Sequence, residues 1–315
     1  MQKKPAVEYS QVDGESHGMR LDNYLLSRIK KVPRSLIYRV IRSGEVRVNS
    51  KRKNAMYRVE KGDKVRIPPI NYEPPKPVEL ELDSAFLADH ILFEDEALMV
   101  LNKPRNLAVH AGSGLSYGII DMLKEHFKAP NLELVHRLDR ETTGCLLIAK
   151  KKSVLRLMHQ QIREHAIAKT YHVLVDGIWP KQLHEVKVPL SSNQKGHGGE
   201  KIVKVDHKAG KESRTTFNRI AAYKDASLLS AHLHTGRTHQ IRVHAQFKGH
   251  AIIGDSKYMS NNRLDFFKGQ YGIKNLLLHA QKLVFMHPIS KEKLMVEAPY
   301  DALFAKAQQD LEEAK

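Results

Sequence analysis

One carboxylate stands between two arginines in a short polar stretch of the 315-residue chain. In HRLDRETTG (136–144), Asp139 has Arg137 and Arg140 close on either side. Nearby positive charge favours the ionised form of a carboxyl group, and an ionised, positioned carboxylate can act as a base or a nucleophile. The strand-like segment 145–149 follows, which places the motif in a turn between strands. An ordinary Arg–Asp salt bridge in a turn would explain the same residues.

Two other segments carry groups that could accompany Asp139. In AKTYHVLV (168–175), Tyr171 alternates with valines on one face of a predicted strand. In HLHTGRTHQIRVH (232–244), a predicted strand runs into a glycine turn and then a short helix, with Arg237, His239 and Arg242 along it. Each segment also has a simpler interpretation: Tyr171 as a core aromatic, and the basic run as a contact to phosphate.

Known metal and nucleotide motifs do not fit these residues. His239 and His244 are five positions apart instead of four, and no glutamate lies between them as in H-E-x-x-H. The single cysteine, Cys145, excludes a disulfide framework within the chain and a cysteine-rich zinc site. The sequence also has no phosphate-binding P-loop, no strand-linked G-x-G-x-x-G and no G-x-S-x-G nucleophile elbow.

The charge of the chain points to a polyanionic partner. Lys and Arg number 52 against 35 Asp and Glu, a net charge of +17, and residues 20–66 alone carry 15 Lys or Arg against four acidic residues. Nucleic acid is the first expectation, with a generally basic protein as the alternative. The N-terminus has no apolar leader and no stretch of 18 apolar residues occurs, so we expect a cytoplasmic protein without a membrane partner.

The basic region has the pattern of a folded module. Apolar spacing predicts helices over 20–31 and 35–43, the second ended by Gly44, and strands over 45–49 and 64–67. The stretch RLDNYLLSRIKKVPRSLIYRVIRSGEVRVN (20–49) resembles the alpha-L RNA-binding module, which implies RNA binding without chemistry. The candidate RNA-binding residues are Arg34, Arg39, Arg42, Arg47, Lys51, Arg52 and Lys53.

Four segments follow from this pattern. We expect a flexible N-terminus over 1–18, the RNA-binding domain over 19–67, a proline-rich linker over 68–80 and a catalytic domain over 81–315. In the last segment, strand-like stretches (91–94, 97–101, 145–149, 170–175 and several across 201–234) outnumber helix-like ones (118–128, 153–165, 302–315) without regular alternation. This favours the α+β class with a largely antiparallel sheet. The Gly-rich stretch 191–200 is expected to be a polar loop.

Together, HRLDRETTG, AKTYHVLV and HTGRTHQIRVH resemble the motifs of the RluA family of RNA pseudouridine synthases. EDEALMVLNKP (94–104) and LLLHA (276–280) fit the same family, so the likeness runs from about 90 to 300. Thr143 departs from the pattern, since the family often has Ser there, but the hydroxyl is kept. The resemblance implies a pseudouridine synthase domain with a mixed, mainly antiparallel bent sheet, a deep cleft and no cofactor. It also implies 23S ribosomal RNA or its assembly intermediates as partner, and a monomer. The absence of any recognised ligand spacing predicts that no metal is required.

The resemblance also assigns roles. Asp139 would be the catalytic carboxylate that converts uridine to pseudouridine, and Arg242 would pair with it. Tyr171 would stack on the target base and could exchange a proton. Because a base inside a stack cannot be reached, the nucleotide must be flipped out, and Arg137 would fill the vacated space. Arg237 and His239 would orient the loop or contact phosphate.

Two other function classes remain to be weighed. One is a ribosome-associated RNA chaperone whose second domain has lost its activity, and the other is a metal-dependent RNA hydrolase. The hydrolase needs a cluster of carboxylate or histidine ligands, which the sequence does not offer. A chaperone has no need of Asp139 in a cleft that binds polyanions, where a carboxylate repels phosphate. The combination of Asp139, Tyr171 and Arg242 therefore favours the enzyme.

Overall fold

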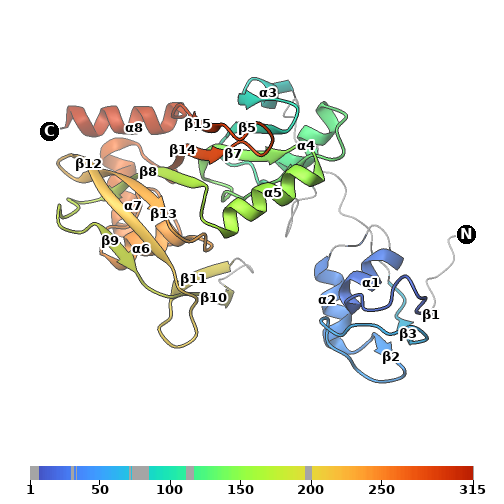
Figure 1. Ribbon diagram of the computed structural model, residues 1–315. Helices are drawn as coiled ribbons and strands as arrows, with labels where there is room; N and C mark the ends of the chain where they lie inside the picture. The colour runs from blue at the N-terminus through green and yellow to red at the C-terminus, as the bar shows by residue number, and fades with distance from the viewer. Residues whose placement is uncertain are drawn as a thin grey trace, which may run out of the picture. The chain divides into compact units, whose positions relative to one another are not determined.

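The computed structural model describes residues 7–29, 32, 34–70, 72, 85–110, 117–195 and 201–314. The chain divides into two compact units, Met1–Pro77 and Val78–Lys315 (Figure 1). Most of the expected proline-rich linker, residues 71 and 73–80, lies outside the described residues. Across the described parts of the chain, no helix is long and apolar enough to cross a membrane.

The N-terminal unit packs two helices on a small sheet. The predicted helices form as α1 (Leu21–Arg28) and α2 (Arg34–Ser43), and the predicted strands form as β2 (Arg47–Val48) and β3 (Lys64–Ile67). The apolar stripe of each helix is buried in one core, with Leu21, Leu25 and Ile37 fully buried.

The expectation of a flexible N-terminus over 1–18 is wrong for its described part. Residues Glu8–Gln11 form strand β1, which pairs antiparallel with β3 and makes the sheet order β1-β3-β2. Val12, directly after β1, is only 2% exposed in the same core. The sequence EYSQ has no apolar alternation, because both faces of this edge strand are largely exposed, so pattern analysis had no signal to detect.

The second unit is built on one ten-stranded sheet. Its main path runs β4-β5-β7-β14-β8-β13-β12-β9, with β15 paired to β14 and β6 paired to β7. Every pairing is antiparallel except that of β7 with β14, so the expected α+β class with a mixed, mainly antiparallel sheet is confirmed. The strands are β4 (Ile91–Glu94), β5 (Leu98–Lys103), β6 (Glu133–Leu134), β7 (Thr143–Ala149), β8 (Ala168–Asp176), β9 (Glu185–Lys187), β12 (Arg214–Ala222), β13 (Ala226–Leu233), β14 (Leu278–Met286) and β15 (Lys293–Glu297).

Helices and a separate hairpin complete this unit. The three predicted helices form as α4 (Ile119–His126), α5 (Lys152–Arg163) and α8 (Ala302–Glu313). The unit also contains the short α3 (Ala85–Ala88), α6 (Gln240–Phe247) and α7 (Asn261–Tyr271). In Figure 1, α6 and α7 lie behind β12 and β13. The expected loop over 191–200 is partly wrong, because β10 (Leu190–Lys195) pairs with β11 (Lys201–Val205) as a two-stranded hairpin. Residues 196–200 lie outside the described part.

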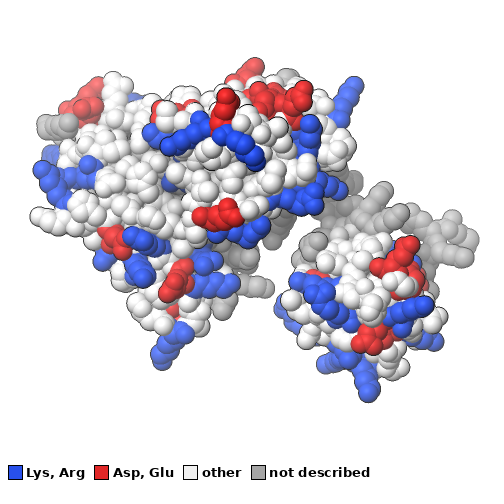
Figure 2. Space-filling view, in the orientation of Figure 1, with Lys and Arg blue, Asp and Glu red and all other residues white. Residues whose placement is uncertain are grey.

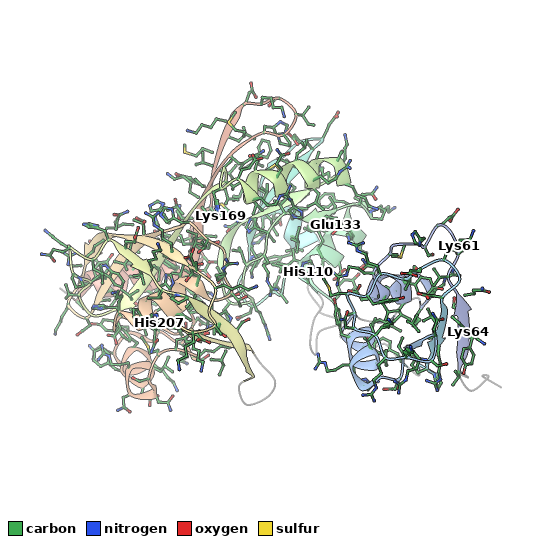
Figure 3. All side chains as sticks on the ribbon, turned by 60° about the horizontal axis from the view of Figure 1, so that its bottom comes forward. Lys61, Lys64, His110, Glu133, Lys169 and His207 are labelled. Carbon is green, nitrogen blue, oxygen red and sulfur yellow. The ribbon has the colours of Figure 1, made fainter. Side chains whose placement is uncertain are left out.

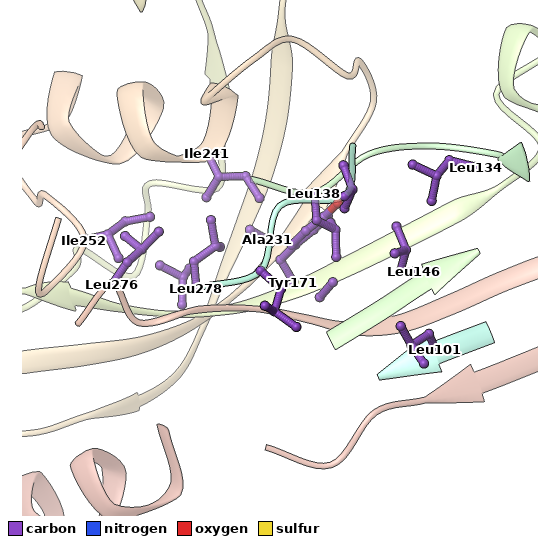
Figure 4. Close-up of a cluster of buried hydrophobic side chains, with 14 of the residues drawn as sticks. Leu101, Leu134, Leu138, Leu146, Tyr171, Ala231, Ile241, Ile252, Leu276 and Leu278 are labelled. Atoms are coloured by element: carbon purple, nitrogen blue, oxygen red, sulfur yellow. The ribbon is translucent and has the colours of Figure 1, made fainter. Parts of the chain in front are cut away.

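The centre of the sheet is buried on both faces. The HRLDRETTG turn leads directly into β7, one of these buried strands. In β7 every residue is buried, with Cys145 and Leu147 in one core and Leu146 and Ile148 in the other. Part of the second core, around Leu138, Tyr171 and Leu278, is drawn in Figure 4. Gly144 allows β7 to approach β14, because its φ is +100° and an added Cβ would lie 2.3 Å from the carbonyl oxygen of Ala280.

Candidate active site

Asp139 lies in the loop between β6 and β7, and buried groups hold the backbone of this loop. The amide of Thr142 donates to the carbonyl of Asp139 at 3.1 Å. Lys103, fully buried on β5, donates from Nζ to the carbonyl of Arg140 at 2.9 Å. Burial lowers the pKa of Lys103 to about 7. The Asp139 side chain itself is 23% exposed, so a fixed backbone presents a carboxylate that solvent and substrate can reach.

The neighbouring arginines are not the partners of Asp139. Arg140 instead donates from Nε to the carbonyl of Asn106 at 3.0 Å. In the described residues, the groups that face the Asp139 carboxylate are instead Arg242 and the His239 ring, at the start of α6. The salt bridge within the turn, which the local sequence allowed, is therefore not what the structure contains.

A glutamine fixes the turn that leads into α6. The Oε1 atom of Gln240 accepts from the Thr235 hydroxyl at 2.7 Å and from the amide of Arg237 at 3.0 Å. Its Nε2 donates to the carbonyl of Arg214 and to the Thr215 hydroxyl, both at 2.9 Å. His239, the residue before the helix, has φ +52°, a left-handed conformation that histidine tolerates better than most residues. These contacts aim the first turn of α6 at the Asp139 loop.

Arg242 reaches Asp139, but its principal partner is a residue that the sequence did not reveal. Its Nη1 lies 3.5 Å from Oδ2 of Asp139. Its Nε and Nη2 form a two-point hydrogen-bonded ion pair with Asp255, at 2.7 and 2.6 Å, and both side chains are buried. Burial opposes the charge on Arg242, yet the hydrogen bonds to Asp255 outweigh it and raise the pKa of the guanidinium. Asp255 thus keeps Arg242 charged and oriented beside Asp139.

His239 approaches the same carboxylate oxygen as a neutral ring. Its Nε2 lies 3.7 Å from Oδ2 of Asp139, and its Nδ1 lies 2.7 Å from the hydroxyl of Tyr258. Burial lowers the pKa of His239 to about 4, although Asp139 acts in the opposite direction. At neutral pH the contact is therefore between a neutral imidazole and a carboxylate.

Tyr171 lies on β8 with its ring in the wall of the site. Only 7% of the residue is exposed, and Figure 4 places it beside Leu138 and Leu278. Burial and, second, the charge of Asp139 raise the pKa of Tyr171. The phenol is therefore neutral at neutral pH. A neutral ring of this kind is better suited to stacking on a nucleobase than to exchanging a proton.

These residues line a common cavity of about 420 Å³. This volume lies within the range of about 300–1,000 Å³ that is typical for small-ligand sites. Apolar side chains such as Leu138, Ile241 and Leu278 form part of the wall beside Asp139 and Tyr171. A nucleobase could be enclosed there with its sugar next to the carboxylate. Pattern analysis brought Asp139, Tyr171 and Arg242 together only through the family resemblance, because their positions along the chain do not indicate proximity.

Cations that pattern analysis missed also line this cavity. Lys169, labelled in Figure 3, precedes Tyr171 by two positions on β8. Residues i and i+2 of a strand share a face, so both side chains point to the same side of the sheet. The Lys169 side chain makes no hydrogen bond or ion pair with another residue in the described ranges, and burial lowers its pKa to about 8. His159 and Arg163 of α5 also line the cavity. A signal for Lys169 was present in AKTYHVLV, as a charged residue on the buried face of a strand.

Arg137 and Arg237 lie at exposed positions of the cavity wall. Arg237 also lines a neighbouring cavity of about 340 Å³, beside the β10–β11 hairpin, together with Ser191, Ser192 and Lys211. Its Nε donates to the carbonyl of Glu212 at 3.1 Å. Both arginines are therefore accessible to a polyanion that enters the site.

The expected RNA-binding residues of the N-terminal unit differ in their surroundings. Arg39, Arg42 and Lys51 are exposed, and the side chain of Arg34 lies outside the described part. Arg52 packs over Gly44 and donates to the carbonyl of Ser43 at 3.3 Å, and Lys53 lies over the ring of Tyr57, with Arg47 half-buried. Figure 2 shows basic side chains with acidic ones among them on the visible faces of both units.

Within the ranges that the structure describes, no group of three or more His, Cys, Asp or Glu side chains could hold a metal ion. Cys145 is buried, and burial raises the pKa of its thiol to about 12, so it is no nucleophile at neutral pH.

Comparison with known proteins identifies both units. The RNA pseudouridylate synthase family matches residues 97–247, which include Asp139, Tyr171 and Arg242, and the S4 domain matches residues 19–65. The ribosomal large subunit pseudouridine synthase C of Haemophilus ducreyi is 44% identical over 299 residues, covering 94% of this chain and 92% of its own. The protein of the same description from Escherichia coli is 44% identical over 317 residues, covering 99% and 98%.

Solved structures agree with this assignment. Human RNA pseudouridylate synthase domain containing 4 is 25% identical and superposes with a TM-score of 0.60, covering 73% of this chain and 95% of its own. Human RNA pseudouridylate synthase domain containing 1, at 23% identity and a TM-score of 0.55, shares the fold. With its N-terminal S4 domain and its relatives at 44% identity over nearly the full length, the chain belongs to the family of RNA pseudouridine synthases.

Proposed function

We propose that this enzyme isomerises specific uridines of 23S ribosomal RNA to pseudouridine, with Asp139 as the catalytic carboxylate. The observation that carries the proposal is the cavity in which Asp139 faces Arg242 at 3.5 Å and shares the wall with Tyr171. The RNA substrate is inferred from the two relatives above, which are described as ribosomal large subunit pseudouridine synthases. The S4 domain supports an RNA partner as well.

The reaction needs little beyond a positioned carboxylate and an enclosed base. The bond between the ribose C1′ and N1 of uracil breaks, the base turns, and a bond forms between C1′ and C5. The hydrogen on C5 leaves as a proton and N1 gains one, so no oxidant or group donor is required. Asp139 acts at the sugar or the base, and Arg242 balances its charge.

The target uridine has to leave its helix to enter the cavity, at a cost of a few kcal/mol. Tyr171 would stack on the flipped base as a neutral phenol, since its pKa is raised by burial. Arg137, at the exposed edge of the cavity, would occupy the space that the base leaves. Lys169 and Arg163 would hold the phosphate of the flipped nucleotide, because the Lys169 ammonium group has no protein partner in the described ranges. Arg237 would contact the adjacent backbone.

The test is a map of pseudouridines in ribosomal RNA from cells that lack the protein, compared with cells complemented by the wild type or by Asp139→Asn. We expect sites in 23S RNA that disappear in the deletion, return with the wild type and stay absent with Asp139→Asn. A full set of pseudouridines in the deletion strain would refute the assignment of 23S RNA. An RNA-binding protein without activity would give the same unchanged map.

A further inference from the structure

A chain of three contacts runs from the β10–β11 hairpin to the carboxylate of Asp139. The amide of Val203, on β11, donates to the hydroxyl oxygen of Tyr258 at 3.0 Å. That hydroxyl lies 2.7 Å from Nδ1 of His239, and Nε2 of the same ring lies 3.7 Å from Oδ2 of Asp139. Tyr258 is half-buried, and its ring also lies under the guanidinium of Arg242, at 5.2 Å.

The first contact sets the direction of the second. Conjugation with the ring leaves a phenol oxygen one strong acceptor direction, and the Val203 amide, which can only donate, occupies it. The single hydrogen of the Tyr258 hydroxyl is then directed at Nδ1 of His239. A neutral imidazole carries one hydrogen, so with Nδ1 accepting, the hydrogen must be on Nε2. His239 is neutral at neutral pH because its pKa is near 4.

The result is a donor that faces the catalytic carboxylate. The shortest contacts of His239 and Arg242 both go to Oδ2 of Asp139, which leaves Oδ1 as the oxygen less engaged by the protein. We propose that His239 and Tyr258 are positioning residues: Tyr258 holds His239 in the tautomer with hydrogen on Nε2, and this N–H orients Asp139 so that Oδ1 faces the substrate. The other tautomer would turn a lone pair toward a carboxylate, which repels it. A separation of 3.7 Å is long for a hydrogen bond, as is usual before a substrate closes the site.

This inference uses the proposed function only in taking Asp139 as the catalytic group. The competing explanation is purely structural: His239 supplies a left-handed residue before α6 and packs edge-on against Tyr258, with ring centroids 5.6 Å apart. Neither feature depends on which nitrogen carries the hydrogen. The two explanations therefore predict opposite orders for a pair of amide variants.

In His239→Gln the amide nitrogen can occupy the place of Nε2, whereas in His239→Asn it can occupy only the place of Nδ1. Asparagine, however, tolerates the left-handed conformation better than glutamine. If His239 acts as a donor, Gln should keep the single-turnover rate within about tenfold of wild type, and Asn should lose about a further tenfold. Together these losses stay within the roughly 100-fold that a small misplacement of a catalytic group can cost. A structural role predicts that Asn is the better substitute, and that order would overturn the proposal.

The tautomer can be measured in the free, full-length enzyme, without any RNA. Imidazole ¹⁵N NMR should report a hydrogen on Nε2 of His239, whose signal is assigned by its loss in His239→Gln. Tyr258→Phe keeps the ring but removes the hydroxyl. It should mix the two tautomers and, because Asp139 is then less well oriented, lower the rate at saturating RNA about tenfold with little change in KM. A hydrogen on Nδ1 in the wild type, or an unchanged tautomer and rate in Tyr258→Phe, would overturn the proposal. An active Asp139→Asn would instead refute the proposed function, whatever the tautomer.

Discussion

Replacing Asp255 by Asn should show how much the buried ion pair between Arg242 and Asp255 stabilises the catalytic unit. Asp255 is fully buried and holds Arg242 by two hydrogen bonds of 2.7 and 2.6 Å. An Asn side chain keeps the shape but removes the charge and turns an N–H group toward the guanidinium. Arg242 is then left with Asp139, at 3.5 Å, as its anionic partner. Removing one partner of a buried ion pair costs about 3–5 kcal/mol.

The expected effect is measurable by calorimetry of the full chain. In a domain of 150–250 residues about 1 kcal/mol shifts Tm by roughly 2–4 °C, so Asp255→Asn should lower the Tm of the catalytic unit by roughly 6–20 °C. The matched control is Asp176→Asn, which breaks the pair with Arg263, at 2.7 Å, whose side chains are 17% and 37% exposed. Because water reaches both side chains of this pair, it should contribute only about 1 kcal/mol, or roughly 4 °C.

A double variant completes the test. Arg242→Met with Asp255→Leu removes both buried charges and should regain part of the lost stability, because apolar residues of similar volume can replace a buried pair at little cost. The recovery should be incomplete, because the amides of Lys257 and Tyr258, which donate to Oδ1 of Asp255 at 3.0 and 3.3 Å, lose their acceptor. The double variant should nevertheless be inactive, because no charged group then faces Oδ2 of Asp139 from the position of Arg242. If Asp255→Asn lowers Tm no more than Asp176→Asn does, the buried pair is not what holds Arg242 in place.

Three further predictions concern phosphate, metal and the N-terminal unit. Only protonated Lys169 attracts phosphate, and its pKa is about 8, so KM for RNA should rise as the pH passes above that value. In Lys169→Arg the side chain stays charged over this range, so KM should depend less on pH. Identical pH profiles of KM in the two enzymes would show that Lys169 does not bind the phosphate. Activity should survive exhaustive chelation, and a loss that zinc or magnesium restores on RNA already folded would contradict this. Deleting residues 1–77, which include the 15 basic residues of 20–66, should make the salt dependence of binding shallower by about 0.7–0.9 per lost phosphate contact. Single-turnover rate at saturation should stay within about tenfold, because Asp139, Tyr171 and Arg242 lie outside the deletion; an unchanged salt slope would show that the unit does not contact RNA.

Periodicity predicted the elements that have a clear apolar face. Helices α1, α2, α4, α5 and α8 were found for this reason, with bounds within a few residues of those observed. Strand β1 and helix α7 were missed because EYSQ and NNRLDFFKGQY lack such a face, and α7 buries only Phe267 fully. Their positions are decided by partners far along the chain, which local patterns do not record.

The candidate site was predicted through residues whose spacing matches known motifs, while their supporting residues were not. Nothing in GDSKY (254–258) indicates that Asp255 pairs with Arg242 or that Tyr258 meets His239. The arginines beside Asp139 in the sequence suggested the wrong partners, because the turn directs Arg140 to the carbonyl of Asn106. Charge proximity along the chain is a poor guide where a tight turn separates neighbouring side chains.

The most direct measurement is the single-turnover formation of pseudouridine in ribosomal RNA by Asp139→Asn. The variant should fold and bind RNA like the wild type, because Arg242 keeps its pair with Asp255 and the Asp139 side chain is partly exposed. Its rate at saturating RNA should fall at least about 100-fold, since the substitution removes the carboxylate and leaves the shape of the site. A variant that melts and binds normally but retains a tenth or more of the wild-type rate would show that Asp139 is not the essential group.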